Sequence, residues 1–310
     1  MAVSILLAKQ VLKLFLILLL GYILVKSGKL KASDSKSVSV ILVYLVIPCM
    51  IINSFQIDYT PQVRNGLIFT MAVSVAVHIV FLALTAALRK PLSLKTVEEL
   101  TVVYSNAGIL VVPLVQTMLG QEYVVYTCSF MVVQQVLLWT HCRHRLCSSE
   151  KLDWKKVFLN INILSLIVGA LLFAGGIELP EVLGGTMEMM AAMVGPMGML
   201  LAGMAIADVP LKQVFGNARG YLSVVLRLLV YPLVVLVCLK VCGAAGMVAD
   251  GKNILLTVYL ACITPACATL TSMAQLYGQD AGFCSVLYVL TTTCSIVTMP
   301  VMIGIYSMWI

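Results

Sequence analysis

The chain has 310 residues, of which 61% are hydrophobic and only 11% are charged. Because roughly a quarter of the residues in a soluble protein are charged, this composition excludes a soluble globular protein, despite the formal net charge of +7. Ten mostly apolar stretches follow one another with short connections, and each is about 20 residues long, enough to cross a bilayer as a helix. These predicted spans 1 to 10 cover residues 5–25, 38–56, 66–88, 98–119, 122–142, 157–175, 184–207, 220–242, 253–276 and 281–307. We therefore expect an all-α polytopic membrane protein with ten transmembrane helices.

Basic residues fall mainly on one side of these spans. If the loops are assigned alternately to two sides, fourteen of the 20 Lys and Arg residues lie in the loops after spans 1, 3, 5 and 7. Cytoplasmic loops carry such an excess, so we expect both termini outside the cytoplasm, in the plasma membrane. The first apolar stretch lacks a small-residue cleavage site and should remain as span 1. The positive charge thus sets topology and does not indicate a nucleic-acid partner.

Spans 4 and 9 are each interrupted by a short polar segment and a proline. Span 4 carries Pro113 at the end of YSNAGILVVP (104–113), and span 9 carries Pro265 within ITPACATLTS (263–272). Proline removes a backbone hydrogen bond from a helix. Broken backbone survives in a membrane only where it is buried in protein or lines a cavity. One broken span in each half of a chain is typical of a transporter binding site.

The residues around the two breaks are the candidate substrate site. A half-helix that starts at a break can hold an anion at its N–H groups, and one that ends there offers carbonyls to a cation or donor. Asn106 either binds a polar ligand or only caps the interrupted helix. The hydroxyls either bind or pack between helices. The candidates are Ser105, Asn106, Gly108 and Pro113 of span 4, Thr264, Pro265, Ala266 and Thr269 of span 9, and Gln134 and Gln135 in the middle of span 5.

Ionisable residues within the spans are few. Arg227 lies about two turns into span 8, where it either snorkels to the cytoplasmic interface or contacts an anionic substrate. His78 in span 3 is expected to be a neutral, hydrogen-bonded core residue. No Asp or Glu lies in the middle of a span, so the sequence offers no carboxylate for proton coupling. We predict no catalytic residue, metal or cofactor; the segment HCRHRLC (141–147) contains metal-ligand types but is interpreted as a basic helix end.

A faint internal repeat divides the chain. Three positions of the first half recur 148 residues later, and coincidence is the alternative explanation: Gly21, Gly28 and Pro48 match Gly169, Gly176 and Pro196. The repeat predicts two units, 1–150 and 151–310, with five spans each. Because five is odd, the second unit enters the membrane from the opposite side. Broken helices 4 and 9 should then cross in opposite orientations, as in other inverted-repeat transporters.

These features resemble the auxin efflux carrier family. The resemblance rests on Asn106 followed by Pro113, on Thr264-Pro265 followed by Tyr277, and on Gly21-Tyr22, Pro48 and Pro300. It covers essentially the whole chain. It implies a scaffold of spans 1, 2, 6 and 7 and a transport domain of spans 3–5 and 8–10. It also implies substrate binding at the crossover of spans 4 and 9, with an elevator-like movement.

The functional hypothesis is a secondary transporter, of the bacterial type, for a small organic anion such as a carboxylate. The alternative is a sodium-coupled symporter of the bile acid symporter-like fold. An enzyme is not expected, because no catalytic motif such as H-E-x-x-H or G-x-S-x-G occurs in the sequence. The partners expected are the substrate anion and the lipid bilayer, and a homodimer is compatible with the sequence.

Overall fold

The computed structural model describes residues 2–147 and 159–310, with the side chains of the first helix described from Lys9 onward. The predicted boundary between the two repeats, at residues 150 and 151, lies outside these residues. Among the described residues all regular secondary structure is helical, and the only β-type pairing is one isolated bridge. The helical fold class is confirmed, whereas ten separate membrane crossings and their inverted symmetry stay predictions.

The first half of the chain contains the helices of predicted spans 1 to 5. In chain order they are α1 (Ala2–Lys26), η1 (Ala32–Asp34), α2 (Ser35–Ile41), η2 (Leu42–Val46), α3 (Ile47–Ser54), α4 (Pro61–Arg89), α5 (Thr96–Val103), α6 (Ala107–Met118), η3 (Gln121–Tyr123), α7 (Val124–Leu137), η4 (Leu138–Cys142) and α8 (Arg143–Leu146). Span 2 is one continuous helix through α2, η2 and α3, and span 5 is one through α7, η4 and α8, because η2 and η4 are single π-helical turns.

The second half contains the helices of predicted spans 6 to 10. They are α10 (Ile161–Ala174), α11 (Glu181–Ala191), α12 (Val194–Ala207), α13 (Leu211–Phe215), α14 (Ala218–Val225), η5 (Leu226–Val230), α15 (Tyr231–Val241), η6 (Ala244–Gly246), α16 (Gly251–Ile263), α17 (Thr269–Leu276) and α18 (Ala281–Trp309). Span 7, expected as one helix, is divided just before Pro196, between Ala191 and Val194.

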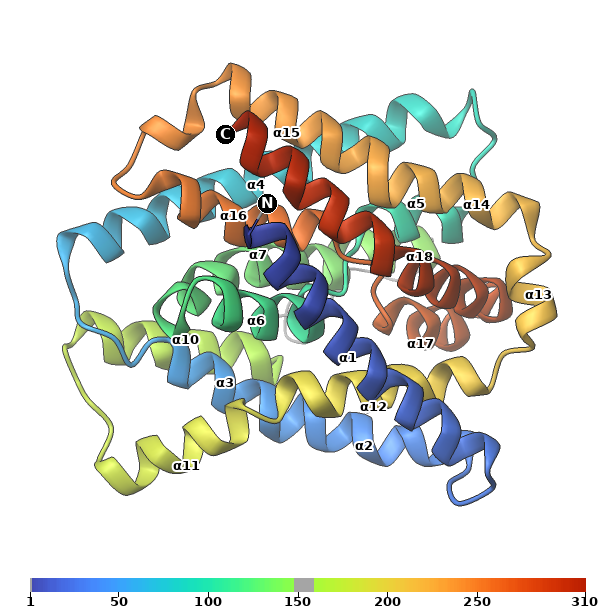
Figure 1. The fold of residues 1–310 in the computed structure, drawn as a ribbon, viewed down its shortest axis with the longest axis horizontal. Helices are drawn as coiled ribbons and strands as arrows, with labels where there is room; N and C mark the ends of the chain where they lie inside the picture. The colour runs from blue at the N-terminus through green and yellow to red at the C-terminus, as the bar shows by residue number, and fades with distance from the viewer. Residues whose placement is uncertain (1, 148–158) are drawn as a thin grey trace.

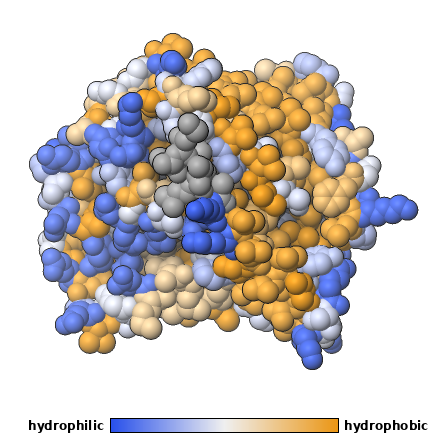
Figure 2. All heavy atoms as spheres, viewed as in Figure 1, coloured by the Kyte–Doolittle hydropathy of each residue, from blue (hydrophilic) through white to orange (hydrophobic). Residues whose placement is uncertain are grey.

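The lengths of these helices fit a polytopic membrane protein. Six helical segments of the described chain are long and apolar enough to cross a bilayer, and α6, α10 and α16 are shorter apolar helices. The six are Ala32–Ser54, Pro61–Arg89, Gln121–Leu146, Glu181–Ala207, Ala218–Val241 and Ala281–Trp309. On the face shown in Figure 2, apolar side chains cover a broad area and hydrophilic ones gather to one side of it. This surface suits contact with lipid.

Local signals at the helix ends explain where the chain turns. Thr60 accepts a hydrogen bond from the Val63 N–H at the start of α4, and Asp280 accepts one from the Phe283 N–H at the start of α18. Both are N-cap contacts. Gly28 and Gly176 follow the ends of α1 and α10 with φ of +74° and +60°. Glycine ends helices in this left-handed conformation, so these two matches of the internal repeat occupy equivalent positions.

Helices of the predicted scaffold lie together. Figure 1 shows α2, α3, α10, α11 and α12 along the lower part of the molecule, with α1 across them, while α4, α14 and α15 form the upper part. Helices α1 and α12 are in backbone contact, because a Cβ on Gly203 would lie only 1.9 Å from the Leu18 carbonyl oxygen. Only glycine fits there, which is the usual way that membrane helices approach closely.

The two ends of the molecule carry different loops. The connections before α2 and between α4 and α5, together with α13, lie at one end in Figure 1, whereas those before α4, α11 and α16 lie at the other. Three of the connections predicted to be basic therefore share one end of the structure. This end is the one expected to face the cytoplasm.

Candidate functional site

The two broken helices meet at their breaks. The first break separates α5 from α6, and the second separates α16 from α17. The Asn106 N–H donates to the Pro265 carbonyl at 2.9 Å, and the Cys267 N–H donates to the Tyr104 carbonyl at 3.1 Å. Ser105 and Ala266 thus form an antiparallel bridge at the centre of the molecule. The breaks cross in opposite directions and satisfy part of each other's backbone.

Each break is supported by one side chain from another span. The Gln134 Oε1 accepts hydrogen bonds from the N–H and the hydroxyl of Ser105 at 2.9 and 2.7 Å, and its Nε2 donates to the Ser105 carbonyl at 2.8 Å. The Thr291 hydroxyl accepts from the Ala266 N–H at 3.2 Å. The two supported residues are the bridge partners. Buried backbone without water needs such partners, so Gln134 and Thr291 keep the breaks open as loops.

Asn106 occupies the N-cap position of α6, but its side chain does not cap the helix. Its side chain makes no capping hydrogen bond, is 5% exposed, and has an amide Nδ2 without a partner among the described residues. The interpretation of Asn106 as only a helix cap is therefore not supported by the geometry. A buried donor without a partner costs free energy, and at a helix N-terminus it is suited to an anionic ligand.

The remaining candidates are distributed around the crossover. Pro265 and Ala266 are buried in the second break, and Gly108 is half-buried in the first turn of α6. The Thr264 hydroxyl donates to the Ala261 carbonyl within its own helix. Thr269 begins α17 and is exposed.

Two candidates lie away from the breaks. Pro113 was expected to interrupt span 4 but lies inside α6, seven residues beyond Asn106. The break comes earlier, at 104–106, because Gln134 and the second break hold that segment extended. Pro113 instead packs toward Gly195 of α12. Gln135 is half-buried, and it is Gln134 that supports the break.

Arg227 does not snorkel to the membrane surface. The residue is 0% exposed, and its guanidinium group donates to carbonyls at the ends of both α5 and α16. Arg227 therefore binds α5 and α16 at their C-terminal ends, where the carbonyl groups are free. The sequence alone does not reveal these partners of Arg227, because the carbonyls belong to residues far away in the chain. His78, by contrast, is the buried core residue expected, and its Nδ1 lies 2.7 Å from the Ser74 carbonyl.

Buried carboxylates anchor the N-terminal end of α5. Glu98 is 0% exposed and binds Arg219 with two hydrogen bonds of 2.6 and 3.0 Å, and Glu99 pairs with Arg145. Both carboxylates occupy the first turn of α5, where the helix dipole favours negative charge. These ion pairs join spans 4, 5 and 8 at the basic end of the molecule. The sequence showed both carboxylates but not their partners.

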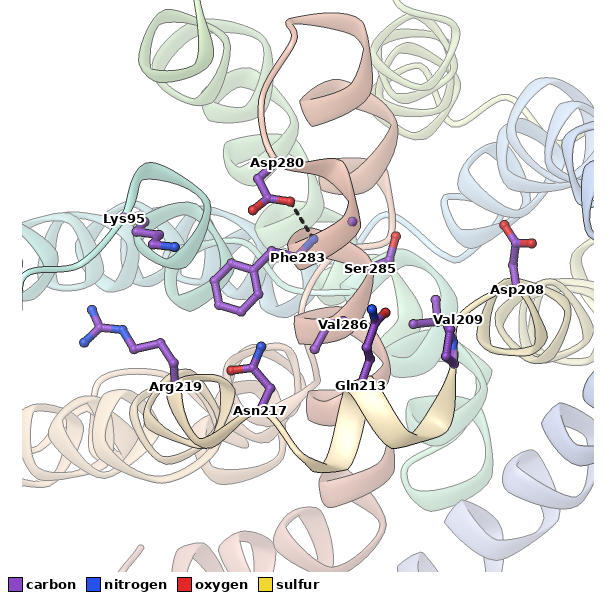
Figure 3. Close-up of a pocket in the computed structure, with 12 residues that line it drawn as sticks. Lys95, Asp208, Val209, Gln213, Asn217, Arg219, Asp280, Phe283, Ser285 and Val286 are labelled. Atoms are coloured by element: carbon purple, nitrogen blue, oxygen red, sulfur yellow. Dashed lines mark hydrogen bonds between the residues drawn. The ribbon is translucent and has the colours of Figure 1, made fainter.

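A cavity of about 630 Å³, lined by both polar and apolar residues, opens at the same end of the molecule. Figure 3 shows Lys95 and Arg219 on one side of it and Asp208 on the other, with Phe283 of α18 between them. The Lys95 Nζ lies 5.4 Å from the centre of the Phe283 ring. Lys95 precedes α5, whose eight residues rise about 12 Å to the first break. The cavity is thus one half-helix away from the crossover.

Comparison with known proteins identifies the family. A search of curated proteins finds no match. A family model described as membrane transport protein matches residues 6–151 and 142–303. These ranges include both breaks and nearly all of the predicted spans. The chain therefore belongs to the membrane transport protein family, the family of auxin efflux carrier transporters.

Proposed function

We propose that this membrane transporter is a secondary carrier that moves a small organic anion, such as a carboxylate, across the plasma membrane. The substrate binds at the crossover of the two breaks. The observation that carries this proposal is the buried Nδ2 of Asn106, which has no partner among the described residues and lies at the N-terminus of α6. An anion there receives hydrogen bonds from Nδ2 and from the first N–H groups of α6.

The charges around the crossover favour an anion over a cation. The helices α6 and α17 both start within three residues of the bridge between Ser105 and Ala266, so two helix N-termini contribute positive potential at the crossover. Arg227 neutralises the opposite, carbonyl-lined ends of α5 and α16. The segments 104–108 and 263–272 contain no Asp or Glu. The local field is therefore positive.

Binding measurements test this function. Purified protein should be stabilised against heat by small carboxylates, with malate as the first probe, and not by amines of similar size. The Asn106→Ala variant should lose most of the carboxylate stabilisation, while Asn65→Ala, a change at the exposed start of α4, should keep it. Stabilisation by amines alone would contradict the anion carrier.

The proposed mechanism is an elevator-like movement of spans 3–5 and 8–10 against spans 1, 2, 6 and 7. The antiparallel bridge favours an inverted repeat. The hydrogen bonds at each break favour it too, because each comes from the last span of the same half: span 5 binds Ser105 and span 10 binds Ala266. The ion pairs of Glu98 and Glu99 join spans of the proposed moving body to one another. These contacts let the crossover travel as one unit.

A glycine face of α12 lies where the proposed bodies meet. A Cβ on Gly198 would lie 2.1 Å from the Ile109 Cγ2, and one on Gly195 would lie 3.0 Å from the Pro113 Cβ. Overpacking typically costs about 1–3 kcal/mol. Gly198→Ala should therefore disfavour the observed state and slow flux about tenfold. Ile109→Ala in the same protein should restore flux, as a double-mutant cycle of flux measurements would show.

A matched control is available on the neighbouring helix. A Cβ on Gly185 of α11 would meet nothing within 4 Å, so Gly185→Ala should leave flux unchanged. Normal flux in Gly198→Ala would place the moving surface elsewhere.

The sodium-coupled alternative is less well supported. Carbonyls at the ends of α5 and α16 are the groups that suit a cation at a broken helix, and the guanidinium of Arg227 already binds them. Flux in proteoliposomes should therefore be unchanged when choline replaces sodium on both sides. A fall of tenfold or more without sodium would favour the symporter.

A further inference from the structure

We propose that the carbonyl oxygens around Arg227 form a monovalent-cation site that the protein fills with its own guanidinium group. Arg227 Nε donates to the Thr264 carbonyl at 3.1 Å, and Nη1 donates to the carbonyls of Val102 and Val103 at 3.1 and 3.4 Å. Nη2 donates to the Ala261 carbonyl at 3.3 Å. One side chain thus satisfies carbonyls from both broken helices.

The surroundings of Arg227 require a positive charge and not merely a bulky side chain. The C-terminal end of a helix carries about half a negative charge, and the ends of α5 and α16 both face the guanidinium. None of the ion pairs found among the described residues includes Arg227. Its charge is therefore balanced by carbonyl dipoles and by the Phe81 ring, which lies 5.6 Å away.

The local backbone is shaped to deliver this side chain. Arg227 is the second residue of η5, a π-helical turn inside span 8. π-Helical turns are rare and are frequently found at functional sites. Arg227 is thus a positioning residue, which holds the two half-helices in register without contacting the substrate.

A cation site that is filled from within can be emptied by mutation and refilled from solution. Arg227→Ala leaves a cavity lined by the same carbonyls, and added guanidinium has the donors of the missing group. Sodium or potassium can bind the carbonyls more simply, whereas choline is bulkier than the guanidinium group that the mutation removes. A role in packing alone would be restored by no cation.

Thermal unfolding of purified Arg227→Ala in detergent tests this proposal. Its melting temperature should lie below that of the unmutated protein and rise by several degrees in millimolar guanidinium chloride, or in sodium or potassium chloride, but not in choline chloride of equal ionic strength. The unmutated protein and Arg64→Ala, which removes an exposed arginine, should show no such rise. Equal responses to all salts, or no response, would overturn the proposal.

A second pair of variants keeps the test decisive if Arg227→Ala does not fold. Arg227→Lys retains the charge, whereas Arg227→Met retains the bulk. The lysine variant should be clearly the more stable, and equal stability would overturn the proposal. These measurements do not need a substrate. A second readout, recovery of carboxylate flux by guanidinium in Arg227→Ala, does rest on the proposed carrier function. If the proposed substrate is wrong, only this flux readout fails, and the unfolding result still tests the cation site.

Discussion

Asn106→Ala is expected to lower carboxylate flux about 30-fold, because a hydrogen bond to a charged group contributes about 2 kcal/mol. The amide is 5% exposed and its Nδ2 has no partner in the described part of the chain, so its removal should not disturb a protein contact. Asn106→Asp is nearly the same size but places a carboxylate at the site. Because this carboxylate repels the substrate anion, flux in Asn106→Asp should fall to background.

Flux of radiolabelled malate into proteoliposomes measures both effects. Thermal unfolding of each variant without substrate should resemble that of the unmutated protein, which separates binding from folding. Gln134→Ala is the useful comparison, because Gln134 makes three hydrogen bonds to Ser105. That variant should lose thermal stability as well as flux. Equal flux in Asn106→Ala and the unmutated protein would remove Asn106 from the mechanism.

The sequence predicted the crossover but not how it is built. The breaks were found because prolines and polar residues are conspicuous within apolar stretches, and that signal is local. It located the second break correctly at Pro265, but Pro113 lies within a regular helix. A membrane helix can tolerate proline in its interior. The extended segment at 104–106 depends instead on Gln134, which comes from another span.

Partners distant in the chain explain the other differences. The burial of Arg227 follows from carbonyls at residues 102, 261 and 264, and it rules out snorkelling, one of the two alternatives that the sequence left open. Thr291 carries no signal in the sequence, since one threonine in a polar stretch of span 10 has no distinctive pattern. Glu98 and Glu99 look like ordinary helix-start residues until Arg145 and Arg219 are brought to them. A single sequence contains no record of such tertiary pairs.

A disulfide between spans 2 and 5 is expected to stop transport almost completely. Ser54 of α3 and Cys128 of α7 are both 1% exposed, and the Ser54 Oγ lies 3.3 Å from the Cys128 Sγ. In Ser54→Cys the two sulfurs need to close to about 2.05 Å, a small movement. Span 2 belongs to the proposed scaffold and span 5 to the proposed moving body. A covalent link between them blocks any elevator step.

The measurement compares flux before oxidation, after oxidation and after reduction, with mass spectrometry to show that the bond has formed. Ser54→Cys combined with Cys128→Ser is the matched control, and it is needed because the chain has ten cysteines. Flux should fall only in the variant that has both thiols, and reduction should restore it. If the disulfide forms and flux persists, spans 2 and 5 do not move apart. The crossover site would then have to open by a local movement of α6 and α17, with the rest of the helices at rest.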